Sequence, residues 1–200
     1  MKIIGICGRS GSGKSTVCEF LSKFGAIILD CDQIYHNLVS ASSPCLDEIK
    51  RRFGDKVVKD DSLDRKSLGA IVFNDSAALS DLNRISHHYV KEELKKQLEI
   101  LKSKKVSVAV IDAPMLFEAK LETWCDLVCA VIANPEMQIE RICHRDLITS
   151  EQAEARVKNQ LSETELRKKA SFVIENNGDL IELEKQCNRL LLKIQSEAQL

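Results

Sequence analysis

Apolar runs of strand length alternate with stretches of helical spacing along most of this chain. Continuous apolar runs with helices between them are typical of a parallel sheet that helices cover on both faces. We therefore expect a three-layer α/β fold with a five-stranded parallel sheet. Ligands of such sheets gather at the carboxyl ends of the strands, and polar residues follow most of the runs. The expected strands are residues 2–7, 26–30, 106–112, 126–133 and 171–175.

Two long segments interrupt this alternation. Residues 32–102 are mostly helical by pattern and contain a turn-rich patch at 59–64. Residues 136–168 are charged and helical, with a break near 148–150. An amphipathic helix is expected over 179–200. We expect one domain made of a core (1–31, 103–135 and 169–200), a helical insertion (32–102) and a lid region (136–168).

The composition restricts the class of partner. An apolar fraction of 44% is enough for a full core, and the net charge is −1. Near-neutral charge and only 4% aromatic residues argue against a nucleic-acid partner. We see no N-terminal signal peptide, and no apolar run approaches the ~20 residues that span a membrane. We expect a soluble, cytoplasmic protein without a membrane partner.

The eight cysteines contain no C-x-x-C pair, and most lie in apolar runs. We expect reduced, partly buried thiols. A zinc site could be imagined at Cys125, Cys129, Cys143 and His144, but these spacings do not match known zinc frameworks.

A glycine-rich stretch, GRSGSGKST, lies between the first expected strand and a helix that runs to about Phe24. It fits the phosphate-loop pattern G-x-x-x-x-G-K-[ST] from Gly8 to Ser15. Glycines let backbone N–H groups wrap an anion, and the helix adds its positive end. Lys14 is expected to reach the β- and γ-phosphates, and the Ser15 hydroxyl to bind Mg²⁺. The expected nucleotide-binding residues here are Gly11, Ser12, Gly13, Lys14, Ser15 and Thr16.

The phosphate loop leaves several reaction classes open. The N-K-x-D motif of guanine-reading switch proteins is absent, and the chain is short for a motor ATPase. A small kinase needs an acceptor site, a residue that orients the acceptor hydroxyl, and arginines that neutralise the moving phosphoryl group. Asp32 follows the second strand and either orients that hydroxyl or caps a helix at 33–39. Asp30 is the neighbour that could be confused with it.

Arginines supply the remaining candidates. Arg141 and Arg145 are four residues apart and share a helix face, which suits a polyphosphate. The alternative is a solvated face on which Glu140 and Asp146 are their local partners. Arg65 is either a ligand of an acceptor phosphate or the ion-pair partner of Asp64, and alone it is more typical of an ordinary surface residue.

With these residues in place, the sequence resembles the dephospho-CoA kinase family along nearly its whole length. The phosphate loop lies at the N-terminus, as it does in that family. The other segments that match family motifs, in the same order, are LDCDQIYHNLV, DDSLDRKSLGAIVFND, RISHHYV, IDAPMLFEA, QIERICHRDLITSEQAEARVKNQLS and VIENNG.

The resemblance implies phosphorylation of the 3′-hydroxyl of dephospho-CoA by Mg²⁺-ATP, which gives CoA and ADP in the last step of coenzyme A synthesis. It implies that Asp32 acts as the base or orients the hydroxyl, with Lys14 and Arg141 as the other catalytic residues. Arg145 would lie close to Arg141 on the nucleotide. The family includes monomers, and we expect a monomer or a weak homo-oligomer.

The resemblance also implies substrate-binding positions. The insertion 32–102 would bind CoA. Asn176 and Gly178, after the fifth strand, are the best candidates to read adenine. The remaining expected substrate-binding residues are Arg65, His87, Pro114, Leu116 and Glu118.

This chain departs from the family in several positions. Thr-Gly-Gly-Ile is usual before G-S-G-K-S, and here Cys7, Gly8, Arg9 and Ser10 occupy those places. Arg9 is expected to point to solvent rather than to the phosphates of the acceptor. The usual His-Pro pair is His87-His88, and a methionine interrupts the Pro-Leu-Leu motif.

Two other functions remain as alternatives. A nucleoside or nucleotide monophosphate kinase shares the sheet, the loop and an arginine lid, but the long insertion and the IDAPMLFEA segment favour dephospho-CoA kinase. A nucleotide-binding regulator without transferase activity would not need Asp32.

Overall fold

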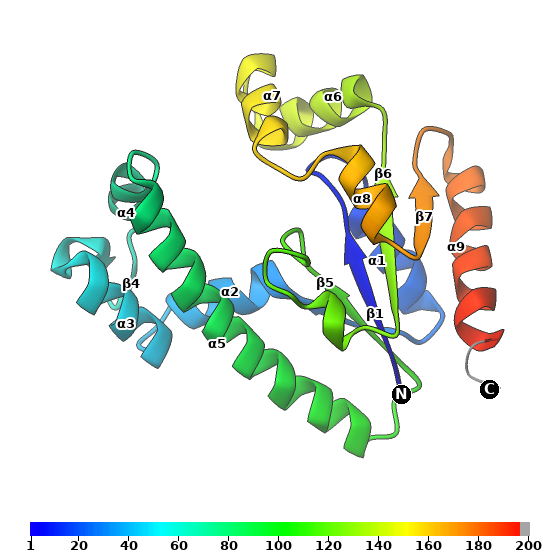
Figure 1. Cartoon of the computed structure of the whole chain (residues 1–200), viewed down its shortest axis with the longest axis horizontal. Helices are drawn as coiled ribbons and strands as arrows, with labels where there is room; N and C mark the ends of the chain where they lie inside the picture. Colours follow the sequence, from blue (N-terminus) through cyan, green and yellow to red (C-terminus); the bar gives the residue numbers. More distant parts are fainter. Residues whose placement is uncertain (197–200) are drawn as a thin grey trace. The chain divides into compact units, whose positions relative to one another are not determined.

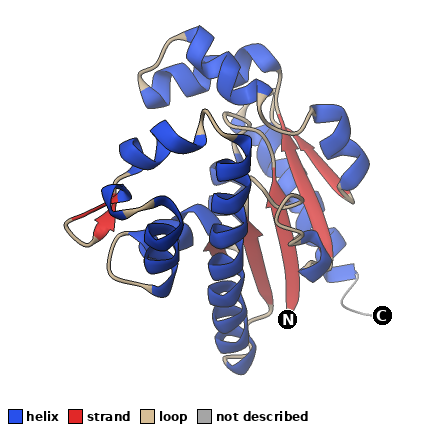
Figure 2. Cartoon of the chain, turned by 60° about the vertical axis from the view of Figure 1, so that its left-hand side comes forward, coloured by secondary structure: helices blue, strands red, loops and turns tan. Residues whose placement is uncertain are grey.

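The computed structural model describes residues 1–196. Within that range five strands form one parallel sheet in the order β2-β5-β1-β6-β7 (Figures 1 and 2). In the register of the sheet, Ile6 of the central strand pairs with Asp112 on one side and Cys129 on the other. The expected α/β fold with its parallel sheet is confirmed. The strands are β1 (Lys2–Cys7), β2 (Ile27–Asp30), β5 (Val108–Asp112), β6 (Leu127–Ile132) and β7 (Phe172–Glu175).

The described chain divides into two compact units. The first, which we call the sheet unit, joins Met1–Leu29 to the chain from Lys104 onward. The second, the helical unit, is Asp30–Ser103 and includes the expected insertion 32–102. None of the helices described is both long enough and apolar enough to cross a membrane. The helices of the sheet unit are α1 (Lys14–Lys23), η2 (Glu122–Trp124), α6 (Pro135–Asp146), α7 (Ser150–Lys158), α8 (Glu163–Lys169) and α9 (Leu180–Ser196).

The two faces of the sheet are covered in different ways. Side chains alternate along a strand, so Ile4 and Ile6 point to one face, where α1 and α9 cover them (Figure 1). Gly5 points to the other face, where an added Cβ would lie 2.9 Å from both Leu116 Cδ2 and Cys125 Sγ. The segment after β5 therefore lies directly on the sheet. Each fully buried Leu or Ile contributes about 1.5–3 kcal/mol to such a core.

Local signals explain where the helices of the lid region begin and end. Leu147 adopts a left-handed conformation with φ 54° and ends α6, which is the expected break near 148–150. Thr149 then caps α7 in a capping box with Gln152. At the end of the chain, α9 occupies most of the helix expected at 179–200, and residues 197–200 of that prediction lie outside the described residues.

The helical unit has a core of its own. Helices α3, α4 and α5 bury the side chains of Ile49, Leu68 and Ile85 there. The turn-rich patch at 59–64 is a small hairpin, in which Asp60 and Asp61 have φ of 50° and 55°, as a tight two-residue turn requires (Figure 2). The elements are α2 (Cys31–Val39), α3 (Pro44–Phe53), η1 (Asp55–Val57), β3 (Val58–Lys59), β4 (Ser62–Leu63), α4 (Arg65–Val72) and α5 (Ser76–Ser103).

Candidate active site

The phosphate loop ends in an uncapped helix N-terminus. Helix α1 begins at Lys14, and no side chain among the described residues caps it at Gly13. The amides of Lys14, Ser15 and Thr16 have no carbonyl one turn earlier to which they can donate in a helix. The Lys14 ammonium donates to the Gly8 carbonyl at 3.2 Å and so lies over the loop. Free N–H groups, the helix dipole and an ammonium together make an anion-binding site.

Side chains from outside the loop hold its carbonyl groups. Arg141 Nη1 on α6 donates to the Gly11 carbonyl at 3.2 Å. Asn176 Nδ2, which follows β7 and is 92% buried, donates to the Ser12 carbonyl at 2.9 Å. Arg141 Nη2 also donates to the Asn176 carbonyl at 3.2 Å. The bonds to Gly11 and Ser12 satisfy loop carbonyls and join residues that are 130 or more positions apart in the sequence.

Close packing explains two of the loop glycines. Gly11 and Gly13 have φ of 75° and 92°, a region that side chains disfavour. An added Cβ at Gly11 would collide with the backbone of Gln138, and one at Gly13 with the side-chain amide of Asn176. Glycine is therefore needed here both for conformation and for the approach of α6 and Asn176.

Arg145 does not join this group. Its guanidinium pairs with its neighbour Asp146 through Nε and Nη2, at 2.7 and 2.9 Å. Arg156 on α7 binds the same carboxylate. The hydrogen bond from Arg145, with the one from Arg156, lowers the pKa of Asp146 to about 2. The structure thus separates the two arginines: Arg141 holds the loop, whereas Arg145 has the local partner that the alternative interpretation gave it.

The segment after β5 positions the expected substrate residues Pro114, Leu116 and Glu118. Pro114 is half-buried, and Glu118 is exposed. Leu116 is fully buried against Gly5, so a substrate contact by this side chain would require it to leave the core. Leu116 instead fixes the segment to the sheet.

In the helical unit, the structure shows which aspartate caps α2. Helix α2 begins at Cys31, and the carboxylate of Asp30 accepts from the Gln33 amide at 2.9 Å. Asp30 is therefore the cap, and the idea that Asp32 caps the helix is wrong. Asp32 lies exposed in the first turn of α2.

Arg65 is linked to the helix that carries Asp32. Its Nη2 donates to Nδ1 of His36 at 2.9 Å. His36 lies one turn after Asp32 on α2, so both occupy the same helix face. Asp64 is the cap of α4 and accepts from the Lys66 and Ser67 amides, rather than pairing with Arg65. His36 is not among the site residues expected from the sequence, although its spacing of four residues from Asp32 predicts that the two share a helix face.

His87 lies on α5, half-buried, in the same unit. Burial is the main reason that its pKa is lower than usual, and the charge of Lys91 one turn later adds to the effect. His87 is therefore poised as a neutral hydrogen-bonding group at neutral pH.

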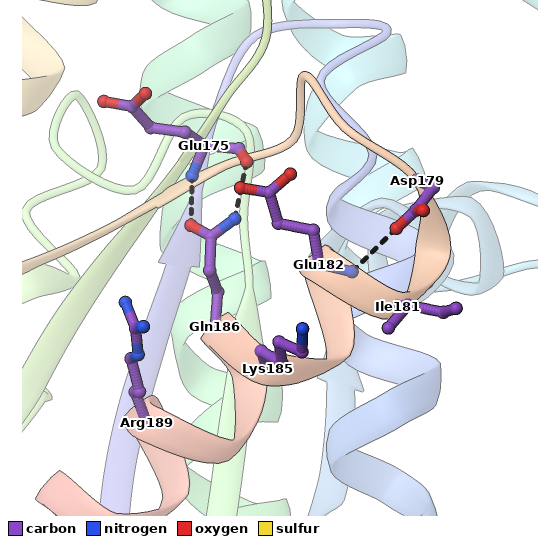
Figure 3. Close-up of a pocket in the computed structure, with 7 residues that line it drawn as sticks. All are labelled: Glu175, Asp179, Ile181, Glu182, Lys185, Gln186 and Arg189. Atoms are coloured by element: carbon purple, nitrogen blue, oxygen red, sulfur yellow. Dashed lines mark hydrogen bonds between the residues drawn. The ribbon is translucent and has the colours of Figure 1, made fainter.

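A hollow of about 470 Å³ lies beside α9, and Figure 3 shows its lining residues. Gln186 closes one side through hydrogen bonds to the backbone of Glu175, at 2.8 and 2.7 Å. The lining carries three carboxylates (Glu175, Asp179 and Glu182) beside two cations (Lys185 and Arg189), so it has no excess of positive charge that would attract a phosphate. Gly178 is at the same turn, where an added Cβ would collide with the Glu182 carboxylate.

Comparisons with known proteins identify the family. A family model described as dephospho-CoA kinase matches residues 2–182. The chain belongs to the dephospho-CoA kinase family. A curated relative of that name from Lactobacillus johnsonii is 38% identical and aligns over 96% of this chain and 97% of its own length. Another from Fusobacterium nucleatum is 41% identical over 94% of this chain and 95% of its own length.

Solved structures agree with this assignment. A protein from Thermus thermophilus superposes with a TM-score of 0.83 at 33% identity, over 96% of this chain and 97% of that one. A dephospho-CoA kinase from Campylobacter jejuni gives 0.72 at 27% identity, over 99% and 100%. A shikimate kinase from Acinetobacter baumannii, at 20% identity and a TM-score of 0.55, shares the fold.

Where the chain departs from the family pattern, the structure shows what the new residues do. Cys7 is buried, and burial raises the pKa of its thiol to about 12. Lys14 lowers that pKa, and Glu118 and Asp112 raise it further, so all these charges lie around the base of the phosphate loop. Asp112 ends β5 beside the central strand. It is not among the site residues expected from the sequence. An acidic residue ending a buried strand was the available signal.

The expectation that Arg9 points to solvent is wrong. Its Nη2 donates to the carbonyl of Val157 on α7 at 2.6 Å. The neighbouring Ser10 is also engaged, since its amide donates to Gln160 Oε1 at 2.9 Å. The direction of Arg9 depends on residues almost 150 positions away, which a local pattern does not reveal.

Proposed function

We propose that the chain transfers the γ-phosphoryl group of ATP to the 3′-hydroxyl of dephospho-CoA and releases CoA and ADP. The main structural support is the phosphate loop, where Lys14, Arg141 and Asn176 donate to loop carbonyls while no side chain among the described residues caps the N-terminus of α1. Membership of the dephospho-CoA kinase family supports the identity of the acceptor.

On the nucleotide side, the catalytic work is charge stabilisation. Lys14 would move from the Gly8 carbonyl to the β- and γ-phosphates. Arg141 donates one N–H group to the Gly11 carbonyl of the loop and one to the Asn176 carbonyl, and its remaining donors would bind phosphate oxygens. Asn176 and Gly178 follow β7 at the end of the sheet and are proposed to contact adenine. Arg145 would contribute only after leaving Asp146.

Mg²⁺ would be held by Ser15 and Asp112. Both offer oxygen, the ligand that Mg²⁺ prefers, and the charge of Asp112 acts at the base of the loop. No group of three or more His, Cys, Asp or Glu within the described range is placed to bind a metal. Kinase sites do not need one, because substrate phosphates complete the coordination. When bound, the ion neutralises charge on the β- and γ-oxygens.

On the acceptor side, we propose that Asp32 accepts the proton of the 3′-hydroxyl or orients it for in-line attack on the γ-phosphorus. Asp32 is exposed in the first turn of α2, and Asp30 rather than Asp32 caps that helix, which supports this role. Arg65 and His87 are proposed to bind the acceptor, Arg65 in the orientation set by His36. Pro114 and Glu118 are proposed to contact substrate from the segment after β5.

The test is ADP release from the purified protein with Mg²⁺-ATP and a panel of acceptors: dephospho-CoA, AMP, CMP, adenosine and none. We expect release only with dephospho-CoA, with CoA formed in equal amount. Release with AMP or CMP instead would assign the chain to the nucleotide kinases. ATP binding without release under any acceptor would favour a regulator.

A matched pair of variants tests the role of Asp32. Asp32→Asn should lower kcat about 10²–10⁴-fold, because general base catalysis by a positioned group contributes that much. ATP affinity should stay unchanged. Asp30→Asn keeps a good capping residue and should retain activity, which makes it the control. Equal kcat for Asp32→Asn and the parent protein would remove Asp32 from the mechanism.

A further inference from the structure

Hydrogen bonds join the first half of the phosphate loop to the end of α7. Arg9 Nη2 donates to the Val157 carbonyl at 2.6 Å. The Ser10 amide donates to Gln160 Oε1 at 2.9 Å, and Gln160 Nε2 donates to Ser10 Oγ at 3.2 Å. All of these residues lie in the sheet unit. We call this set of contacts, made by Arg9, Ser10, Val157 and Gln160, the clasp.

The helix end explains why Arg9 binds where it does. Val157 lies in the last turn of α7, where carbonyl groups lack a partner further along the helix. The backbone N–H of Gln160 donates to this carbonyl at 3.2 Å. The Arg9 cation lies at the negative end of the helix dipole. The Nε–H of Arg9 is buried and has no hydrogen-bond partner among the described residues. The Val157 bond must therefore offset a desolvation cost.

Gln160 is fixed as firmly as Arg9. Its amide oxygen accepts from one loop atom, and its amide nitrogen donates to another, so the side chain is held in one orientation. It follows directly after α7, and a shift of the loop would break both bonds together.

The helices that meet the loop behave as one body. Ile142 on α6 packs with Ala153 and Val157 on α7 in a small core, and Asp146 and Arg156 join the two helices by an ion pair. We call α6 and α7 the helix pair. Because α6 carries Arg141, the helix pair meets the phosphate loop both at the clasp and at the Gly11 carbonyl.

We propose that Arg9 is a positioning residue, which with Gln160 fastens the helix pair to the phosphate loop before nucleotide binds. This places Arg141 for the transfer step and keeps water away from the phosphoryl group. The proposal rests on the proposed function, since it concerns how the same ATP site is kept closed.

Opening the clasp has a defined chemical consequence. With the helix pair released, a water oxygen attacks the γ-phosphorus in place of the acceptor hydroxyl. The bond from the γ-phosphorus to the bridging oxygen breaks, and ADP, inorganic phosphate and a proton are the products. A weakened clasp therefore raises acceptor-independent hydrolysis relative to transfer and lowers kcat, because Arg141 is less well placed.

The test uses Arg9→Gly, which restores the usual family residue, and Gln160→Ala as a second variant from the other side of the clasp. Arg9→Lys keeps one donor for the Val157 carbonyl and should rescue part of the effect. Lys158→Ala is the control, since Lys158 is exposed in the same turn of α7. Far-UV circular dichroism and thermal unfolding establish that each variant is folded.

The first readout is limited proteolysis with a glutamate-specific protease, which can cut at Glu151 and Glu154 between residues 147 and 162, without nucleotide or acceptor. Arg9→Gly loses a hydrogen bond from a charged group and Gln160→Ala loses two neutral ones, so each should raise the cleavage rate about tenfold. Lys158→Ala should cleave at the parent rate. This measurement needs no catalysis, so its outcome does not depend on the identity of the acceptor.

The second readout is the ratio of ADP released without acceptor to CoA formed with acceptor. We expect this ratio to rise several-fold in both clasp variants, with a lower kcat and little change in the KM for dephospho-CoA. If Arg9→Gly and Gln160→Ala are folded and match the parent protein in cleavage rate and in this ratio, the proposal is overturned. If no protein in the series forms CoA while cleavage still rises, the proposed function fails and the clasp stands.

Discussion

Arg141 and Arg145 show how residues of the same type, one turn apart, are given different tasks. Both lie on one face of α6, so the sequence offered no reason to separate them. The difference arises from Asp146, which follows Arg145 directly and accepts two hydrogen bonds from its guanidinium. Arg141 directly follows Glu140, but its guanidinium donates to the Gly11 and Asn176 carbonyls.

This difference predicts unequal effects on catalysis. Arg141→Ala should lower kcat by about 10³, as loss of a charge-stabilising arginine does in other phosphoryl-transfer enzymes. Arg145→Ala should lower it less than tenfold, because Arg145 must first give up Asp146. Steady-state kinetics at saturating ATP measure both. A loss of less than about threefold in Arg141→Ala would exclude it from the mechanism.

His87 predicts a pH dependence of stability. Burial and Lys91 lower its folded pKa, whereas in the unfolded chain it titrates near about 6.5. Below that pH the unfolded state binds more protons, so the free energy of unfolding falls as pH drops toward the folded pKa. This one site contributes at most about 1.4 kcal/mol per pH unit.

Urea unfolding between about pH 7.5 and about pH 5.5 measures this contribution. His87→Gln should flatten the slope of stability against pH, and the exposed neighbour His88→Gln should not. A slope that His87→Gln leaves unchanged would contradict the assignment of His87 as a buried neutral group.

At the scale of elements, the beginning of α2 is where the sequence was least decisive. Asp30 and Asp32 both precede helical residues, and both satisfy the preference for aspartate near a helix start. The choice depends on where β2 ends and on the extended backbone of Asp30, with ψ of 110°. Sequence pattern fixes such a boundary only to within a few residues.

Removing the cap should act on stability alone. Asp30→Ala leaves the Gln33 amide without its partner and should lower the free energy of unfolding by about 1 kcal/mol. Asp32→Ala should cost much less, because Asp32 is exposed and is not the cap. Denaturant midpoints at constant slope measure the difference. Equal midpoints for the two variants would show that the Asp30 cap does not contribute about 1 kcal/mol to the free energy of unfolding.

Other elements were predictable to different degrees, for physical reasons. The central strands of the sheet, β1, β5 and β6, are largely buried on both faces, so their apolar runs mark them clearly; β6, for example, is buried at every position. The hairpin of β3 and β4 has two residues in each strand, too few for any periodicity to appear. The phosphate loop was predictable because its glycines are required by geometry, whereas the clasp joins segments whose contact no local pattern encodes.

At the scale of the whole molecule, the two compact units carry different halves of the proposed reaction. The phosphate loop, Arg141 and Asn176 belong to the sheet unit. Asp32, Arg65 and His87 belong to the helical unit, which has its own buried core. The nucleotide half is therefore assembled within the sheet unit, and the helical unit supplies Asp32, Arg65 and His87 to the proposed acceptor half.

Hydrogen exchange should reveal this division. A ligand that binds the folded form slows exchange of the amides whose opening it opposes. A non-hydrolysable ATP analogue alone should protect residues 8–16 and α6 more than α3 and α4. Dephospho-CoA alone should protect α2 and α4 more than α9. Uniform protection of both units by either ligand would contradict independent half-sites.

The burial of the cysteines has a practical consequence for following this molecule in solution. All eight lie in the described part of the chain, and none of them forms a disulfide there. Burial raises the pKa of Cys7 and Cys125 to about 12, so almost no thiolate is present there at neutral pH, and Cys18 and Cys31 are also buried. Cys143 differs from Cys7, Cys18 and Cys31 in that it is only half-buried.

Cys143 is only half-buried, and its Sγ lies 3.9 Å from the Ser150 hydroxyl, where α6 meets the start of α7. A maleimide dye should therefore label this position in preference to the buried thiols, without any cysteine being replaced. Its fluorescence would report, in real time, changes in the surroundings of the junction between α6 and α7.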